Sequence, residues 1–192
     1  MSVKAFSGAK YFLTFIDDHS RKTWIYFLKT KDEVFYRFKE FKALVENLRG
    51  KKIKVLRSDN GGEYVDKDFT DYCAKEDIGR EWTTPYNPEQ NGVAEKKNGT
   101  IVEAVRAMLY DQDMPKFLWA EACNTVVYIQ NRTPHRALCK ITPEKVFTGK
   151  TPELSHFKIF GSLAYCHVPE EKRKKLDQNA EKGYLVGYNE NV

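Results

Sequence analysis

The sequence predicts an α/β domain, with helices packed on a mixed β-sheet, because β-rich segments and segments of helical periodicity follow one another along the chain. Of its 192 residues, 41% are hydrophobic and 14% aromatic, which is enough to build a well-packed core. The residue pattern changes beyond Pro152, where short β-rich runs surround a charged loop. That change predicts a second, smaller unit in the C-terminal part of the chain.

A β-hairpin is the first expected element. The runs 11–16 and 23–28 are rich in aromatic and β-branched residues, and the polar turn 17–22 joins them. The elements expected after the hairpin are a helix from Asp32 that Gly50 stops, a strand over 53–56, a shorter helix over 66–78 and a strand over 80–84.

Helices dominate the middle of the chain. A loop with prolines and glycine occupies 85–92, and apolar residues at helical spacing then predict helices over 93–109 and 116–130. Thr142 followed by Pro143 is a helix start, and Gly149 closes that short helix. The last strands are expected within 159–168 and 183–188.

The overall charge is mildly basic, with 32 Lys and Arg against 27 Asp and Glu, a net of +5. This excess fits a nucleic-acid partner but is also common among other soluble proteins. The four cysteines contain no Cys-x-x-Cys pair, which disfavours a structural zinc site and favours reduced thiols in the nucleus or cytoplasm. No apolar run is long enough to cross a membrane, and the N-terminus lacks a signal-peptide pattern, so we expect an intracellular, non-secreted protein.

Two carboxylates stand out by their position. Asp59 follows a predicted strand and precedes Gly61 and Gly62, while Glu95 lies near the start of a predicted helix. If folding brings them together, they can hold a divalent metal ion for phosphodiester chemistry. Taken without other motifs, the more typical interpretation is that Asp59 is a turn residue and that Glu95 is a favourable charge at a helix N-terminus.

Several motifs, in order and at matching spacing, resemble the integrase of copia-type retrotransposons, a retroviral-type integrase core of the ribonuclease H-like fold. The resemblance spans nearly the whole chain, and the part after residue 152 resembles the start of the SH3-like barrel that follows this core. The motifs that carry it lie at 11–21, 57–64, 84–95, 117–122, 128–132, 160–162 and 183–188.

The resemblance implies Mg²⁺- or Mn²⁺-dependent processing of a DNA 3′ end, followed by strand transfer into target DNA. It makes Asp59 and Glu95 the catalytic and metal-binding residues. It also implies that the protein binds element ends and target DNA and forms homo-oligomers with other integrase subunits. The residues expected to contact DNA are Asn60, Gly92, Lys96, Lys97 and Asn98. A solvated polar residue is an equally good interpretation of Asn98.

The family pattern also requires a third carboxylate, on a strand before the hairpin. Only Met1 to Gly8 lie upstream of the hairpin here, and none of them is acidic. Asp17 and Asp18 match hairpin residues of the family and are expected to cap the turn. We therefore expect an N-terminally truncated core whose first, central strand is missing, so that two half-sheets remain and the chain is poorly stable with weak or no strand-transfer activity.

A second departure lies four residues after Glu95. The family usually has a basic residue at this position, and this chain has Gly99. Glycine weakens a helix and has no side chain with which to contact phosphate.

The domains predicted from the sequence are an integrase core at 1–152 and a partial SH3-like domain at 153–192. The inherited function is DNA integration by a polynucleotidyl transferase or endonuclease. The alternative is a non-catalytic nucleic-acid-binding remnant or scaffold derived from an integrase. The basic run 172–175 is expected to be a solvated loop, with DNA contact or a nuclear address as the other interpretations.

Overall fold

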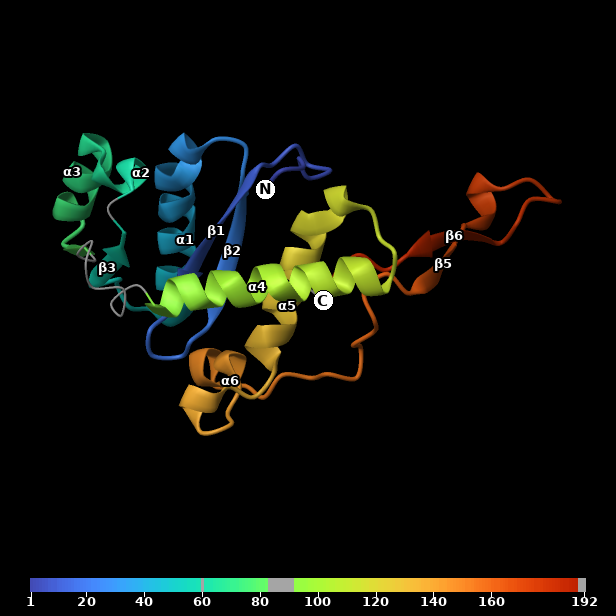
Figure 1. Ribbon diagram of the computed structural model, residues 1–192. Helices are drawn as coiled ribbons and strands as arrows, with labels where there is room; N and C mark the ends of the chain where they lie inside the picture. The colour runs from blue at the N-terminus through green and yellow to red at the C-terminus, as the bar shows by residue number, and fades with distance from the viewer. Residues whose placement is uncertain (60, 83–91, 190–192) are drawn as a thin grey trace. The chain divides into compact units, whose positions relative to one another are not determined.

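The computed structural model describes residues 1–59, 61–82 and 92–189, and the chain divides into two compact units (Figure 1). Unit 1 comprises residues 1–16 and 24–100, and unit 2 comprises residues 17–23 and 101–192. Two elements, the opening hairpin and helix α4 (Gly92–Asp111), supply residues to both units. The described helices include none long and apolar enough to cross a membrane.

Unit 1 contains two pairs of strands. β1 (Tyr11–Ile16) pairs with β2 (Thr23–Leu28), at the bounds that the sequence predicted. β3 (Val55–Ser58) pairs in parallel with β4 (Gly79–Trp82). Within the described residues the two pairs form separate two-stranded sheets, which confirms the prediction of two half-sheets.

Aromatic side chains build the core of unit 1. Helix α1 (Val34–Arg49) follows the short helix η1 (Lys31–Glu33) and lies along β1 and β2 in Figure 1. Its Phe41 ring stacks on Phe15 of β1 with the ring centroids 4.3 Å apart. One turn earlier, Phe38 is fully buried and stacks on Phe69 of helix α3 (Lys67–Lys75). Gly50 ends the helix in the left-handed conformation, as its position in the sequence predicts.

The helix predicted over 66–78 is present as α3 (Lys67–Lys75). A short helix that the sequence did not predict, α2 (Gly62–Val65), precedes it, and both come before β4. Trp82, at the end of β4, is 37% exposed and therefore lies outside the core. Its ring lies against the guanidinium group of Arg80, with Cζ 4.2 Å from the ring centroid, rather than among apolar side chains. The other two tryptophans, Trp24 and Trp119, are buried.

Unit 2 is mainly helical. The stripe Ile101, Val105 and Leu109 of α4 is buried, as the helical spacing predicts. The short helix η3 (Lys116–Leu118) leads into α5 (Trp119–Arg132), and η4 (Arg136–Leu138) and α6 (Pro143–Thr148) follow. Both predicted caps of α6 are present. The Thr142 hydroxyl accepts a hydrogen bond from Lys145 N, and Gly149 adopts the left-handed conformation.

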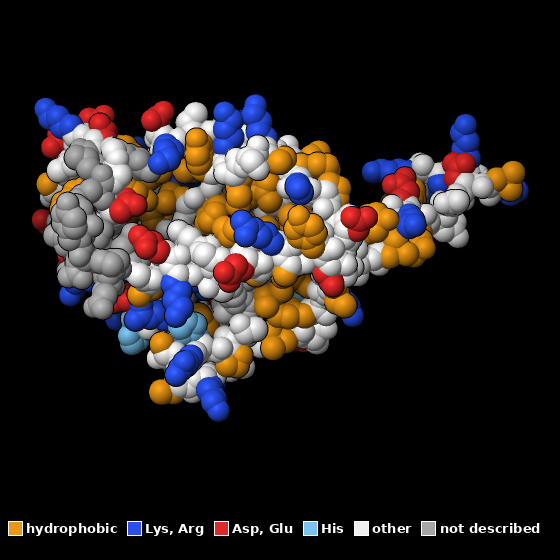
Figure 2. All heavy atoms as spheres, viewed as in Figure 1, with side chains coloured by type: hydrophobic (Ala, Val, Ile, Leu, Met, Phe, Trp, Pro, Cys, Tyr) orange, Lys and Arg blue, Asp and Glu red, His pale blue; other side chains and the backbone are white. Residues whose placement is uncertain are grey.

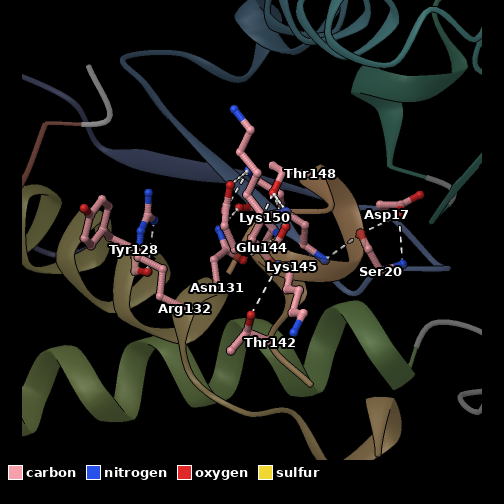
Figure 3. A network of polar contacts seen from close by, with 12 residues as sticks. Asp17, Ser20, Tyr128, Asn131, Arg132, Thr142, Glu144, Lys145, Thr148 and Lys150 are labelled. Atoms are coloured by element: carbon pink, nitrogen blue, oxygen red, sulfur yellow. Dashed lines mark hydrogen bonds and ion pairs between the residues drawn. The ribbon is translucent and has the colours of Figure 1, made fainter. Parts of the chain in front are cut away.

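A polar network holds the hairpin turn inside unit 2 (Figure 3). The buried Asn131 side chain of α5 accepts from Thr23 N and donates to Thr23 O, at 2.9 and 2.8 Å. Nearby, the Lys22 ammonium forms an ion pair of 2.8 Å with Glu144 of α6. Because both contacts are largely withdrawn from water, removing one partner would leave a buried polar group unsatisfied.

The two hairpin aspartates have structural roles, as predicted. Asp17 Oδ2 accepts hydrogen bonds from the Ser20 backbone N and from Ser20 Oγ, at 2.8 and 2.5 Å. Asp18 forms an ion pair with Arg21, which adopts a positive φ in the turn. The turn is thus capped by its own side chains.

The last described elements are β5 (Leu163–His167), η5 (Glu170–Lys172) and β6 (Ala180–Tyr184), with β5 and β6 antiparallel. A lone two-stranded hairpin is marginally stable in water. Here Tyr188 anchors the chain beyond β6, since its hydroxyl exchanges two hydrogen bonds of 2.7 Å with the Lys158 backbone. Its ring also stacks on Tyr128 of α5. The predicted division at residue 152 remains a prediction.

Candidate metal and nucleic-acid site

Asp59 lies directly after the last residue of β3, at the carboxyl end of the parallel β3–β4 pair. The strand runs two residues later than the sequence predicted, so no spacer separates it from the carboxylate. The Asp59 side chain is exposed, and its Oδ1 accepts a hydrogen bond of 3.1 Å from Gly61 N. The carboxylate thereby closes its own turn and still faces solvent.

An ion pair links β3 to β4 two residues before Asp59. Arg57 donates from Nε and Nη2 to Glu81 Oε2, at 3.0 and 2.8 Å, and the two residues are register partners on β3 and β4. Both side chains are about half exposed, so the pair adds little stability.

Glu95 lies in the first turn of α4, and its side chain is exposed. A negative charge there is favoured by the helix dipole, whatever else it does. Gly92 is the first residue of the helix, and an added Cβ there would meet no atom within 4 Å. The loop before it, 85–91, and the predicted DNA contact Asn60 lie outside the described residues.

Asn98 connects this part of α4 to the first strand. Its Oδ1 accepts a hydrogen bond of 2.8 Å from Thr14 Oγ1 on β1, and both residues belong to unit 1. Asn98 follows Glu95 by three positions and therefore lies on the same helix face. The contact orients the helix turn that presents Glu95. A role for Asn98 in DNA binding would fall to its amide nitrogen.

The two predicted lysine contacts differ in accessibility. Lys96 is exposed, whereas Lys97 is half-buried, and burial lowers the pKa of its ammonium group to about 8. Lys96 is thus the better placed of the two to reach phosphate. Gly99, where a basic residue is usual in the resembled family, lies exposed within an unbroken helix, and an added Cβ there would also meet no atom within 4 Å.

Asp59 and Glu95 therefore come from different elements of the same compact unit, a strand end and a helix start. Both offer exposed carboxylate oxygens, the hard donors that Mg²⁺ and Mn²⁺ prefer. Across the described ranges, no group of three or more His, Cys, Asp or Glu is arranged to hold a metal ion. If a divalent ion were bound by these two carboxylates, water would have to complete most of its coordination shell.

Sequence reasoning missed the side chain that ties the helices of this region to β4. The Arg80 guanidinium lies over the Phe69 ring, with Cζ 4.7 Å from its centroid, and over Trp82. Its Nη2 donates a hydrogen bond of 2.9 Å to Tyr64 O. Alternation along β4 was the available signal, since Arg80 and Trp82 share one face of the strand and Glu81 lies on the other.

Two family models match the sequence. The integrase core domain matches residues 1–88, a range that includes Asp59 and ends before Glu95. The retroviral polymerase SH3-like domain matches residues 162–192. The order of the two matches is the order predicted from the motifs.

Curated relatives align with nearly the whole chain. The retrovirus-related Pol polyprotein from transposon TNT 1-94 of Nicotiana tabacum is 50% identical over 188 residues, which is 98% of this chain and 14% of the polyprotein. The corresponding polyprotein from transposon RE2 of Arabidopsis thaliana is 35% identical over 93% of the chain and 12% of its own length. The chain therefore corresponds to a small part of these relatives.

Solved structures show the same fold at low sequence identity. A chain of the simian T-cell lymphotropic virus intasome, solved in complex with PP2A regulatory subunit B56 gamma, matches with a TM-score of 0.59 and 18% identity, covering 90% of this chain and 60% of its own. The HTLV-2 integrase catalytic core domain in complex with magnesium, in a trimeric form, matches with a TM-score of 0.54 and 18% identity, covering 74% and 88%.

The fold is that of a retroviral integrase core, ribonuclease H-like and followed by an SH3-like piece. The aligned relatives confirm the copia-type resemblance that the motifs carried. The chain carries an integrase core segment followed by a retroviral polymerase SH3-like segment, and the relatives with which it aligns are copia-type retrotransposon Pol polyproteins.

Proposed function

We propose that this chain supplies part of a DNA-integrating active site, in which Asp59 and Glu95 bind a divalent ion, Mg²⁺ or Mn²⁺. The observation that carries the proposal is the placement of two exposed carboxylates, one at the carboxyl end of β3 and one in the first turn of α4. The match to the integrase core domain supports the choice of ion. So does the structural neighbour that was solved in complex with magnesium.

The proposed reaction has two steps. In 3′-end processing, water attacks a phosphorus atom of the DNA end, a new P–O bond forms, and the bond to the 3′ oxygen breaks. In strand transfer, the freed 3′ hydroxyl attacks a phosphorus of target DNA in the same way. When bound, the divalent ion lowers the pKa of the attacking oxygen and stabilises the leaving one.

The chain's own residues would position these groups. Asp59 is fixed by its turn and by the adjacent Arg57–Glu81 pair, while Glu95 is oriented by the helix that Asn98 ties to β1. Lys96, Lys97, Gly92, Asn98 and Asn60 are the proposed DNA contacts. Preorganised carboxylates of this kind reduce the reorganisation that the reaction requires.

Residues 1–192 by themselves are proposed to have weak or no joining activity. Two features support this: the separate two-stranded sheets of unit 1, and the two-carboxylate donor set. The second candidate function is a non-catalytic nucleic-acid-binding scaffold, favoured by the basic surface described below. We further propose that the chain assembles with other integrase subunits, by analogy with the intasome and with the trimeric and dimeric integrase cores among its structural neighbours. We also propose that it is located in the nucleus or cytoplasm. The boundary between the core and the SH3-like domain is proposed at residue 152.

Metal titration separates the two functions. Mn²⁺ binding to the chain, followed by calorimetry or electron paramagnetic resonance, should weaken at least tenfold in Asp59→Asn and in Glu95→Gln, because each variant loses a charged oxygen donor. Glu103→Gln is the matched control, since Glu103 is an exposed glutamate on the same helix. Equal Mn²⁺ affinity in all four proteins would exclude a metal site at this pair and leave the scaffold.

Activity is tested with a duplex oligonucleotide that mimics a DNA end, incubated with the chain and Mg²⁺. We expect joined products at or near background. Robust joining that Asp59→Asn abolishes would refute the proposed weak activity and establish the chain as an active integrase. Metal binding without joining is the outcome that the present proposal predicts.

A further inference from the structure

A basic projection lies on unit 2 between α5 and the SH3-like segment. We name residues 135–150 the basic hook; it consists of η4, the turn at Cys139 and Lys140, and α6. Four of its cationic side chains are exposed: Arg136, Lys140, Lys145 and Lys150. Figure 2 shows Lys and Arg side chains gathered over the part of the surface that α6 and its preceding loop occupy in Figure 1.

These four charges are unopposed. None of them forms an ion pair with another residue in the described part of the chain. The single acidic residue of the hook, Glu144, is engaged by the buried Lys22. The next acidic residue along the chain, Glu153, accepts a hydrogen bond from Ser155. The positive potential of the hook is therefore directed into solvent.

The other basic run of unit 2 is different in this respect. Residues 170–182 contain five Lys and Arg but also four Asp and Glu, so their charges nearly cancel. Within that segment Arg173 bonds to Glu170 and to Asn179, and Lys174 N bonds to Asp177. A similar number of cations thus produces a local field in the hook and little field in the 170–182 segment.

The hook is also held in one shape. His135 N donates to Ile141 O at 3.0 Å, and Lys140 N donates to His135 O at 3.2 Å, which closes the loop on itself. Cys139 and Lys140 both have positive φ, at 50° and 68°, a conformation that costs non-glycine residues roughly 1–2 kcal/mol each. Phe147 is buried and the α6 caps are complete, so the loop projects from a fixed base.

We propose that the basic hook binds the phosphate backbone of duplex DNA, as a surface separate from the Asp59–Glu95 pair. Exposed cations on a backbone that is already ordered attract phosphates, and they release condensed counterions as they make contact. The contact carries no sequence information, because it reads only the backbone. The inference deepens the proposed function by naming a DNA-binding surface, and it requires neither metal nor catalysis.

The test measures binding of the full chain to a fluorescent duplex with EDTA present, at several salt concentrations. The hook variant is Arg136→Gln/Lys140→Gln/Lys145→Gln/Lys150→Gln. The matched control is Lys172→Gln/Lys174→Gln/Lys175→Gln/Lys182→Gln, which removes the same charge from the balanced segment, where all four side chains are also exposed. Circular dichroism and thermal unfolding check that both variants remain folded.

Loss of four phosphate contacts should make the slope of log K against log salt less negative by about 3–4 in the hook variant. Between about 50 and 200 mM salt, the unmodified chain should therefore lose about a hundredfold more affinity than the hook variant loses. The control should keep a slope near that of the unmodified chain. Equal slopes in the two variants, or an unmodified chain that does not bind duplex DNA, would overturn the inference. Tighter binding of duplex RNA than of DNA would overturn DNA as the partner.

Chemical footprinting supplies a readout that does not depend on variants. An amine-acetylating reagent should label Lys140, Lys145 and Lys150 at least fivefold less when duplex DNA is bound, and label Lys172, Lys174 and Lys175 equally with and without DNA. The reverse pattern would contradict the inference. Because EDTA removes divalent ions, this result is independent of metal binding at Asp59 and Glu95, and either proposal can fail alone.

Discussion

Thr14 on β1 donates a hydrogen bond from its hydroxyl to the side-chain oxygen of Asn98 on α4, across 84 residues of sequence and 2.8 Å of space. This bond connects the opening hairpin to the helix turn that carries Glu95. Both partners are partly buried, so water competes with the bond only in part. The geometry of the candidate site therefore depends on a contact outside the carboxylates.

Thr14→Val should destabilise the chain by about 1 kcal/mol, since the substitution keeps the shape of the side chain and removes the donor, leaving the Asn98 oxygen without it. The matched control is Thr100→Val on α4, whose exposed hydroxyl donates to Lys96 O within the same helix. That variant should stay within about 0.5 kcal/mol of the unmodified chain. Urea unfolding measures both, and equal effects would show that the long-range bond has no special weight.

Gly99→Arg should both stabilise α4 and strengthen DNA binding. Replacing an exposed helical glycine contributes about 0.5–1 kcal/mol, and there is room for a side chain, because nothing lies within 4 Å of a Cβ. The arginine would add a phosphate contact and raise the magnitude of the salt slope by about 0.9.

Gly99→Ala separates the two effects of that change. It should give most of the stability gain, measured by thermal unfolding, and leave the slope of DNA binding against salt unaltered. An alanine variant that binds DNA as strongly as the arginine variant would mean that helix stability, rather than a phosphate contact, controls binding.

Lys42 of α1 should determine how the unfolding free energy of the chain changes at acidic pH. Its ammonium lies 2.8 Å from Glu46 Oε2 and 2.8 Å from Glu76 Oε2, and its side chain is only 9% exposed. The hydrogen bond from Lys42 holds the pKa of Glu76 below its usual value. For Glu46, burial acts to raise the pKa, but the hydrogen bonds from Lys42 and Ile53 N outweigh it and the pKa is lowered.

Carboxylates with lowered pKa values stabilise the fold fully above their unfolded value of about 4.5, and this stability is lost as the pH falls through the lower folded values. Lys42→Met should therefore lower the unfolding free energy at about pH 7 by about 1–3 kcal/mol, with a smaller difference from the unmodified chain at about pH 3. The exposed Lys75→Met is the control and should change little at either pH. A difference that does not depend on pH would assign the effect to packing alone.

Gly161, in the motif that resembles the SH3-like segment, should tolerate no side chain. Its φ is +81°, and an added Cβ would lie 2.7 Å from Gln112 Cβ and 3.2 Å from Met114 Cγ. Gly149 has nearly the same φ, +79°, but nothing lies within 4 Å of its Cβ position. Gly149→Ala should cost about 1 kcal/mol from the left-handed backbone.

Gly161→Ala should cost about 1–3 kcal/mol more than Gly149→Ala, because it adds overpacking to the same backbone strain. Chemical denaturation of the two variants measures the difference. Equal costs would mean that the Gln112 side chain moves aside freely and that only the backbone conformation selects glycine at this position.

Local features of the sequence predicted most of the elements. The hairpin strands have the expected bounds, and the helix ends at Gly50, Thr142 and Gly149 are those that capping residues indicate. The motifs predicted the integrase family, which the family matches and the aligned relatives confirm. Such signals depend on residues a few positions apart, so the sequence by itself determines them.

The tertiary structure decided which distant side chains meet. It buried Lys42 between two glutamates, placed the Arg80 guanidinium group over the Trp82 ring and joined Thr14 to Asn98. It also left the charges of the basic hook unopposed while those of residues 170–182 are balanced and partly paired. These outcomes depend on how helices and strands pack together, and periodicity, capping and net charge carry no information about that packing.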